Sequence, residues 1–348
     1  MRFSEIILNE ERKVRLTVLL QEVGGEFAPI DRRPAILVLP GGGYAMCSDR
    51  EADPVALAYA RAGYQTFILR YSTGKYKTWP NPLNDYEQAM ELIRGNADEW
   101  HLDAGRVAVV GFSAGGHLAA CAATVAKNRP NAAILGYAAL TKEIADACQP
   151  GMPYPVECAD DKTPPCFLFA TRDDNVVDIR NTIDFQRSLA DRGVNFEAHI
   201  YSFGMHGFST AEPYVNQVAL SSRVKNWVQD SIDWLAEVWG AFTGRGFGKP
   251  MFYRTVNTDM LPMLSLDCTV GHLRQQNETV QNLLKDVFEA LEALIQAKFE
   301  NLPAARAIID HYKARNIIQM LQIPAEITEQ LDDELRKIEN KQLSEEVV

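Results

Sequence analysis

The chain has 348 residues, of which 47% are hydrophobic and 23% charged, and its formal net charge is −11 at pH 7. This composition is typical of a soluble globular protein with a substantial core. The acidic balance argues against a nucleic-acid partner and against binding to an anionic membrane surface, because both need clustered basic residues. A neutral small molecule is the better-fitting substrate.

The N-terminal segment and the cysteines bear on the cellular compartment. Residues 1–16 are too charged for a signal peptide, and no apolar run approaches the roughly 18 residues that span a bilayer. The six cysteines are scattered without a CxxC motif or a Cys/His cluster, so we expect no zinc site. We therefore expect a cytoplasmic protein with reduced thiols. Only export would favour pairing of Cys148 with Cys158, which share a proline-rich loop.

Hydrophobic periodicity predicts the elements in chain order. Alternation or short apolar runs predict strands at 14–20, 35–39, 66–69, 107–110, 133–135, 165–170 and 196–203. Helical spacing or alanine-rich composition predicts helices at 51–63, 86–100, 113–125 and 179–192. Strands that alternate with helices predict an α/β fold, with a mostly parallel sheet and helices on both faces.

Two segments interrupt this alternation. Residues 141–164 are proline-rich and irregular, which fits an active-site lid and a plain surface connection equally well. Residues 244–262 begin with three glycines within five residues and separate chain regions of different composition. We therefore expect a catalytic domain at 1–243, a linker at 244–262 and a helical C-terminal domain at 263–348.

The C-terminal region carries an apolar seam with the spacing of packed helices. Its members are Val280, Leu284, Val287, Leu291 and Leu294. This seam requires burial against the sheet domain, against later helices of the same region, or against a second copy of the chain. We favour the last, a homodimer through the C-terminal helices, because closed dimers are the commonest soluble oligomers.

Residues 111–115 read Gly-Phe-Ser-Ala-Gly, with a predicted buried strand before them and a predicted helix after them. This is the setting of a nucleophile elbow, a tight turn that exposes a serine hydroxyl above a sheet. The alternative is a glycine-rich turn that merely begins a helix. The context favours Ser113 as the nucleophile.

A serine hydroxyl needs a general base, and in this type of fold the chain order is serine, acid, histidine. His206 lies in a loop between two glycines just past a predicted strand, whereas the other late histidines lie in a strand or in the C-terminal helices. We expect His206 to be the base. His117, one helical turn after Ser113, cannot easily reach back to it and is expected to be structural.

Two adjacent aspartates, Asp173 and Asp174, follow the predicted strand at 165–170 and compete for the acid position. The one that is not the acid would hydrogen-bond the loop backbone. The spacing alone does not choose between them.

The glycines of residues 41–43 follow another predicted strand, where the backbone can approach an ester oxygen closely. An oxyanion hole needs two backbone N–H donors, and the residue after the nucleophile, Ala114, supplies one. The candidates for the second donor are Gly42 and Gly43. No Gly-Lys-Ser/Thr follows the glycines, which excludes a phosphate-binding loop.

The chain contains LPGGGY at 39–44, RVAVVGFSAGGHLAA at 106–120, an Asp-Asp-x-Val-Val segment at 173–177 and GMHGF at 204–208. Together these motifs resemble bacterial esterases related to acetyl-xylan esterases, within the α/β-hydrolase superfamily, over residues 14–239. The resemblance implies that Asp174 is the acid and that acetyl groups on sugars or oligosaccharides are the substrate. Asp178 replaces the usual proline of the family, and Pro40 stands where many related esterases have a histidine.

The predicted function is therefore hydrolysis of short-chain carboxylic esters through Ser113, His206 and Asp174, with a small-molecule ester as partner. This reaction implies neither a metal nor an organic cofactor. Tyr44 and Phe208 end two of these motifs and are the candidate pocket residues. One alternative is an amide or aryl-formamide hydrolase or peptidase of the same fold, since a fold does not settle its substrate. Another is a binding protein that has lost turnover.

Overall fold

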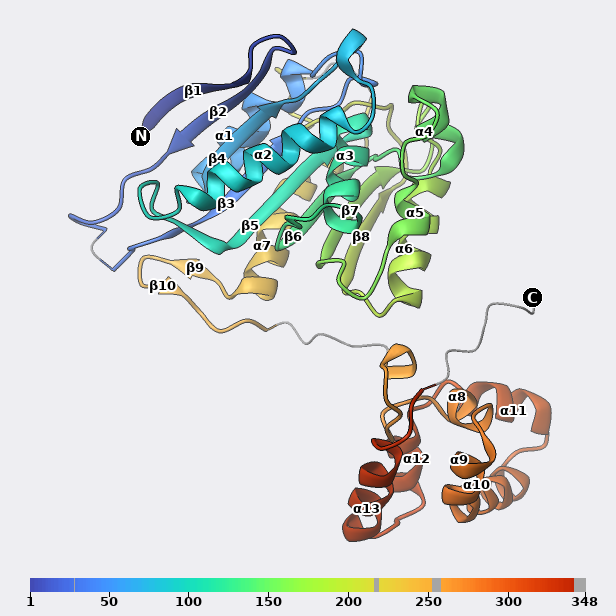
Figure 1. Ribbon diagram of the computed structural model, residues 1–348. Helices are drawn as coiled ribbons and strands as arrows, with labels where there is room; N and C mark the ends of the chain where they lie inside the picture. Colours follow the sequence, from blue (N-terminus) through green and yellow to red (C-terminus); the bar gives the residue numbers. More distant parts are fainter. Residues whose placement is uncertain (28, 216–218, 252–257, 341–348) are drawn as a thin grey trace. The chain divides into compact units, whose positions relative to one another are not determined.

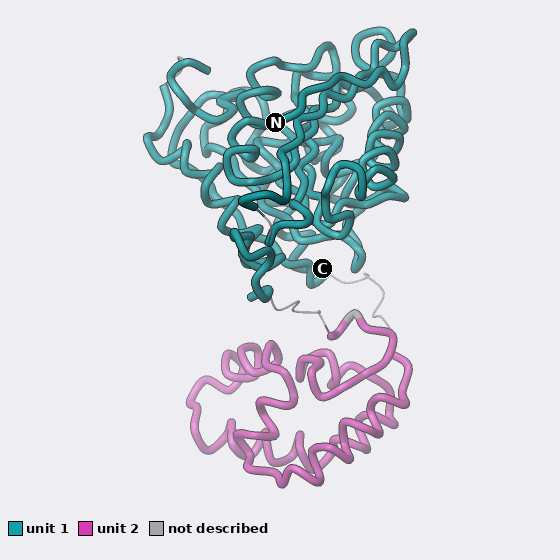
Figure 2. The backbone as a smooth tube through the Cα atoms, turned by 90° about the vertical axis from the view of Figure 1, so that its left-hand side faces the viewer, with its two compact units in different colours: residues 1–254 teal, residues 255–348 magenta. Residues whose placement is uncertain are grey.

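The computed structural model describes residues 1–27, 29–215, 219–251 and 258–340 (Figure 1). The chain divides into two compact units, Met1–Arg254 and Thr255–Val348, which are coloured separately in Figure 2. The segment expected to be a linker, 244–262, includes the boundary between the units. Its first residues belong to a small hairpin of unit 1, and its residues 252–257 lie outside the described residues.

Unit 1 is built on an eight-stranded sheet with the strand order β1-β2-β4-β3-β5-β6-β7-β8. Its strands are β1 (Arg2–Asn9), β2 (Val14–Leu20), β3 (Arg33–Leu39), β4 (Gln65–Arg70), β5 (Leu102–Phe112), β6 (Ala132–Gly136), β7 (Cys166–Thr171) and β8 (Phe196–Tyr201). β2 runs antiparallel to both β1 and β4, and every other neighbouring pair is parallel. The predicted α/β fold with a mostly parallel sheet is confirmed.

Helices cover both faces of this sheet (Figure 1). The helices of unit 1 are α1 (Asp53–Arg61), α2 (Asn81–Gly95), α3 (Ser113–Thr124), α4 (Lys142–Cys148), α5 (Pro155–Cys158), α6 (Arg180–Asp191) and α7 (Trp227–Trp239). On one face, Leu37 and Val109 share a core with α2, α3 and α6. On the other, Ile36 and Val110 share a core with α1 and α7. The central strands are apolar at successive positions because both of their faces are buried.

Several elements differ from the predicted pattern. β1 was not predicted, because it is an edge strand whose residues are mostly exposed and partly charged. The segment 141–164, expected to be irregular, contains the short helices α4 and α5. Helix α7 was also not predicted, although Trp227, Trp234 and Leu235 are buried at helical spacing. After α7, β9 (Phe242–Thr243) and β10 (Gly246–Phe247) form the hairpin of unit 1.

Unit 2 is helical and has a core of its own. Its helices are α8 (Val270–Arg274), α9 (Glu278–Leu283), α10 (Lys285–Lys298), α11 (Leu302–Ile309), α12 (Ala314–Met320) and α13 (Ala325–Leu335). Four members of the predicted seam, Val280, Leu284, Val287 and Leu291, are buried together with Ile317 and other residues of unit 2. Later helices of the same unit therefore cover the seam, so its burial gives no argument for a second copy.

The parallel strands β3 to β8 place their carboxyl ends along one edge of the sheet. In open α/β sheets this edge is where ligands bind. The loops that follow β3, β5, β7 and β8 carry the residues singled out from the sequence. Among the described residues, no helix has the length and apolar character needed to cross a membrane.

Candidate active site

Ser113 lies at the turn from β5 into α3 and has a left-handed backbone, with φ of 52°. A non-glycine residue in this conformation is strained and persists only where its surroundings enforce it. Glycines on both sides permit the tight turn. A Cβ atom on Gly111 would lie 2.2 Å from the carbonyl oxygen of Gly115, and one on Gly115 would lie 2.1 Å from that of Leu39. The elbow predicted from the sequence motif is therefore present.

His206 lies in the loop after β8 and faces Ser113. Its Nε2 atom is 2.9 Å from Ser113 Oγ, and its Nδ1 atom is 2.7 Å from Asp174 Oδ2. A carboxylate can only accept, so Nδ1 carries the ring proton and Nε2 is free to accept from the serine hydroxyl. The structure thus brings together three side chains from three separate loops, with the imidazole in the tautomer that a base requires.

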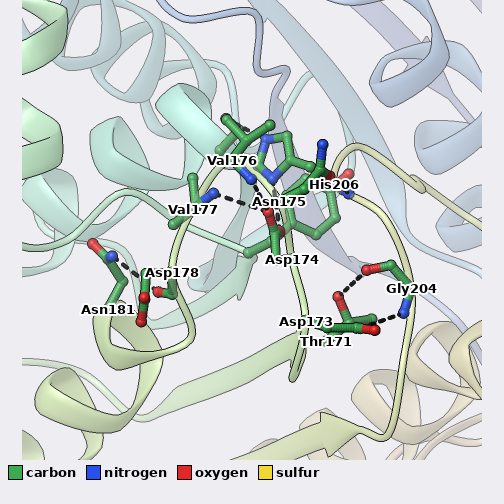
Figure 3. A network of polar contacts seen from close by, with 12 residues as sticks. Thr171, Asp173, Asp174, Asn175, Val176, Val177, Asp178, Asn181, Gly204 and His206 are labelled. Atoms are coloured by element: carbon green, nitrogen blue, oxygen red, sulfur yellow. Dashed lines mark hydrogen bonds and ion pairs between the residues drawn. The ribbon is translucent and has the colours of Figure 1, made fainter.

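Asp174 and Asp173 take different positions, as Figure 3 shows. The Asp174 side chain is fully buried, and its Oδ1 accepts from the N–H groups of Val176 and Val177 while Oδ2 contacts His206. Asp173 turns away and accepts from the N–H of Gly204 at 2.8 Å. Asp174 therefore contacts the imidazole, and Asp173 anchors the loop that carries His206.

The glycine loop after β3 lies against the nucleophile. A Cβ atom on Gly41 would lie 3.0 Å from Ser113 Cβ and 2.6 Å from the oxygen of Phe112, so only glycine fits there. Gly42 and Gly43 have φ values of 128° and 60°. Within the described part of the chain, their N–H groups have no hydrogen-bond partner. The N–H of Ala114 lies in the first turn of α3, where backbone donors lack a partner within the helix. All three N–H groups are therefore available to a ligand.

Tyr44 and Phe208, the candidate pocket residues, are both buried, with 1% and 0% of their surfaces exposed. The Tyr44 hydroxyl lies 2.7 Å from His117 Nδ1. Phe208 packs on Tyr137, with their ring centroids 4.6 Å apart. Among the described residues, both side chains are thus shielded from solvent, and each completes the core next to the loop that carries it.

His117 is also buried, and its Nε2 atom lies 2.9 Å from the carbonyl oxygen of Pro153. Burial lowers the pKa of His117 to about 4. The ring is therefore neutral near pH 7. It connects α3 to the proline-rich segment 141–164 and does not contact Ser113 in the described hydrogen-bond network.

Glu51 is a residue next to the site that the sequence analysis did not single out. It ends a short 3-10 turn, Asp49–Glu51, and is 3% exposed. Its Oε2 accepts from the N–H of Gly41 at 2.8 Å, and its Oε1 accepts from the Tyr137 hydroxyl at 2.6 Å. A glutamate in a loop is usually solvated, so the sequence held no local signal for this buried carboxylate.

Tyr137 follows β6 and packs edge-on against His206, with ring centroids 4.9 Å apart. Burial, and secondly the charge of Glu51, raise the pKa of Tyr137 well above its ordinary value. The phenol therefore stays protonated and donates to Glu51. Burial also raises the pKa of Glu51, while its hydrogen bonds from Tyr137 and Gly41 oppose that rise. The carboxylate has two donors that compensate its removal from water.

Comparison with known proteins adds to this geometry. The BD-FAE family model matches residues 29–134. Endo-1,4-beta-xylanase B of Butyrivibrio fibrisolvens is 30% identical over 210 residues, which are 52% of this chain and 33% of that protein. The acetylxylan esterase of Xylanibacter ruminicola is 27% identical over 218 residues, 56% of this chain and 45% of that protein. The chain thus spans less than half the length of these two curated relatives.

Solved structures cover a larger share of this chain. MGS-M1, an alpha/beta hydrolase enzyme from a deep-sea metagenome library, is 38% identical with a TM-score of 0.63, covering 68% of this chain and 97% of that one. The acetyl ester-xyloside bifunctional hydrolase from Caldicellulosiruptor lactoaceticus is 28% identical with a TM-score of 0.57, covering 64% and 87%. The resemblance inferred from the motifs is confirmed, and the chain belongs to the α/β-hydrolase family.

Proposed function

We propose that the chain hydrolyses carboxylic esters with short acyl groups, acetyl first among them, carried by sugars or oligosaccharides. The observation that carries this proposal is the position of His206, within hydrogen-bond distance of both Ser113 Oγ and the buried Asp174 carboxylate. A nucleophile, a base and an orienting acid in this order are the requirements of acyl transfer through an acyl-enzyme.

In the first step, Ser113 Oγ attacks the ester carbonyl carbon while His206 Nε2 takes the hydroxyl proton. Asp174 holds the ring in its tautomer and stabilises the imidazolium that forms. The N–H groups of Ala114 and of Gly42 or Gly43 bind the oxygen on which negative charge develops. His206 then gives its proton to the leaving alcohol. In the second step, His206 activates a water molecule that releases the acid from Ser113.

The choice of a carbohydrate ester rests on the relatives. Two of them are named for acetyl ester or acetylxylan hydrolysis and one for xylan hydrolysis. The preference for short acyl groups has a physical argument as well. Met152 and Ala159 of the segment 141–164 are buried in the core of unit 1, and the segment has few large aliphatic residues that could cover a long acyl chain.

The test is a series of esters of one alcohol with acyl groups of increasing length, followed by acetylated xylo-oligosaccharides. We expect the highest kcat/KM for acetyl and measurable acetate release from the oligosaccharides. Fluorophosphonate labelling of the wild type, with Ser113→Ala as the matched control, shows whether Ser113 is the nucleophile. A chain that labels at Ser113 but prefers octanoyl esters contradicts the substrate proposal. A chain that does not label at Ser113 contradicts the mechanism.

A further inference from the structure

We propose that Glu51 and Tyr137 are positioning residues that hold two loops in register for the reaction. These are the glycine loop, which carries residues 41–43 after β3, and the histidine loop, which carries His206 after β8. This inference rests on the ester hydrolysis proposed above. The two side chains, with the N–H groups of Gly41 and Ser209, form one continuous set of hydrogen bonds, here called the carboxylate bridge. Its two ends lie in the two loops that must act together on the tetrahedral intermediate.

The directions of the hydrogen bonds in the carboxylate bridge are fixed. The backbone N–H groups of Gly41 and Ser209 can only donate. Ser209 N–H donates to the Tyr137 hydroxyl oxygen at 3.0 Å, and the Tyr137 hydroxyl donates to Glu51 Oε1 at 2.6 Å. Gly41 N–H donates to the other oxygen, Oε2, at 2.8 Å. Each oxygen of the Glu51 carboxylate thus accepts one hydrogen bond, as an ionised carboxylate can.

The glycine-loop end of the carboxylate bridge fixes the peptides that precede the candidate oxyanion donors. Gly41 is confined between Glu51 and the nucleophile, since a Cβ atom there would lie 2.7 Å from Glu51 Oε2 and 3.0 Å from Ser113 Cβ. The next two peptides carry the N–H groups of Gly42 and Gly43. Because Glu51 sets the orientation of the Gly41 peptide, it also limits where these following donors can point.

The end of the carboxylate bridge in the histidine loop fixes His206 through a ring–ring contact, in addition to the contact with Asp174. The Tyr137 ring lies edge-on to the His206 imidazole, with ring centroids 4.9 Å apart, and its centroid is 4.6 Å from that of Phe208. The Tyr137 hydroxyl accepts from the backbone N–H of Ser209, three residues after His206. The Ser209 hydroxyl in turn donates to the carbonyl oxygen of Arg50, the residue before Glu51. The histidine loop and the segment that carries Glu51 are therefore joined twice.

Stability alone gives a poor account of this arrangement. A buried carboxylate loses its hydration, and hydrogen bonds to it must first offset that cost, so its presence is weak evidence for a stabilising role. Catalytic groups, by contrast, must be held within about 0.5 Å of their productive positions, which neighbouring hydrogen bonds achieve. A positioning role predicts damage to turnover where a purely structural role predicts damage only to folding.

The test compares Glu51→Gln and Tyr137→Phe with the double variant and with Asp85→Asn. Glutamine can accept at one end of the carboxylate bridge only. Phenylalanine keeps the ring contacts with His206 but removes the hydroxyl. Asp85 is the matched control: it is a fully buried carboxylate that accepts from Ser72 N–H at 2.8 Å and from Arg12 at 2.6 Å, outside the site.

Each single bridge variant is expected to lower kcat for a short acyl ester by about 10- to 100-fold, with KM changed by no more than about threefold. The Kd of phenylboronic acid, which forms a tetrahedral adduct with an active serine, should rise by a similar factor. The double variant should be no worse than the more damaging single variant, because both act through the same bridge. Asp85→Asn should lower the unfolding temperature and leave kcat within about twofold.

Wild-type turnover and Ser113 labelling are measured alongside, which separates the two proposals. A wild-type chain with neither ester turnover nor labelling at Ser113 contradicts the proposed function. Wild-type turnover together with folded bridge variants whose kcat stays within about twofold overturns the positioning role, as do losses that multiply in the double variant. If Glu51→Gln does not fold by circular dichroism, Tyr137→Phe decides the question by itself.

Discussion

The hydroxyl oxygen of Tyr44 and the Nδ1 atom of His117 lie 2.7 Å apart inside the core of unit 1. His117 Nε2 contacts the carbonyl oxygen of Pro153, which can only accept, so Nε2 carries the proton and Nδ1 accepts from Tyr44. A neutral histidine thus links the end of the glycine loop to the segment 141–164. Protonation of Nδ1 would turn it from an acceptor into a donor, so the Tyr44 hydroxyl could no longer donate to it.

This arrangement makes the stability of unit 1 depend on pH. Burial lowers the pKa of His117 to about 4, whereas an unfolded chain protonates histidine at about 6.5. The stabilisation of unit 1 by neutral His117 is complete above about pH 6.5 and is lost as the pH falls through about 4. The free energy of unfolding falls by about 3 kcal/mol over this range. Urea unfolding at several pH values in this window should show that His117→Asn has a flatter pH dependence than the wild type.

His101 supplies the control for this experiment. Its side chain is exposed, and its φ of 49° suits asparagine as well as histidine. His101→Asn should keep the wild-type pH dependence. An unchanged pH dependence in His117→Asn would show that His117 does not carry this effect.

Ser113→Ala and His206→Ala should each lower ester turnover by a factor on the order of 10⁴ or more, because the members of a triad act as a unit. Neither change removes a core side chain, so unfolding temperatures should stay close to that of the wild type. Steady-state rates and thermal unfolding on the same preparations check both statements. Turnover near the wild-type rate in pure Ser113→Ala would refute the assignment of the nucleophile.

Asp174→Asn and Asp173→Asn form a matched pair of neighbouring changes. Asp174→Asn should lower kcat by about 10⁴-fold, as the comparable change does in serine proteases of the chymotrypsin type, because the amide cannot hold the imidazole in its active tautomer. Asp173→Asn leaves a side-chain oxygen that can accept from Gly204 N–H, so its kcat should fall far less. The opposite ranking of the two kcat values would exchange the roles of the aspartates.

A chain truncated after Met251 should keep its turnover of a small acetyl ester within about twofold, since independently packed domains tolerate separation. The reason is that Ser113, Asp174, His206 and the candidate oxyanion donors all belong to unit 1. Light scattering on both chains measures whether unit 2 contributes to assembly, which stays a prediction. A folded truncated chain without turnover would mean that unit 2 completes the active site.

The sequence allowed much of the sheet to be predicted because buried parallel strands leave unbroken apolar runs, such as 35–39 and 107–110. β1 leaves no such run, since one of its edges has no neighbouring strand and its residues are largely exposed. The seam of unit 2 was recognised, and the later helices that cover it were one of three options, but a second copy of the chain was favoured over them. Periodicity shows that a helix face is buried and does not show what covers it.

The candidate site divides in the same way. Ser113, His206 and the glycine loop could be predicted because their roles require short motifs and a fixed chain order. Glu51 could not, because its partner Tyr137 is 86 residues away and their contact exists only after folding. The choice between Asp173 and Asp174 likewise came from family resemblance, since two adjacent carboxylates in one loop differ only in where the folded backbone points them.

The crowding around Ser113 also determines where this chain can change. Glycines at the elbow have backbone atoms at 2.1 to 2.2 Å from any added Cβ, so variation there breaks the turn itself. Met46, Val176 and Met205 occupy the glycine, acid and histidine loops and are about half exposed. Substitutions at these three positions can therefore change the surface of the loops without disturbing the turn at Ser113.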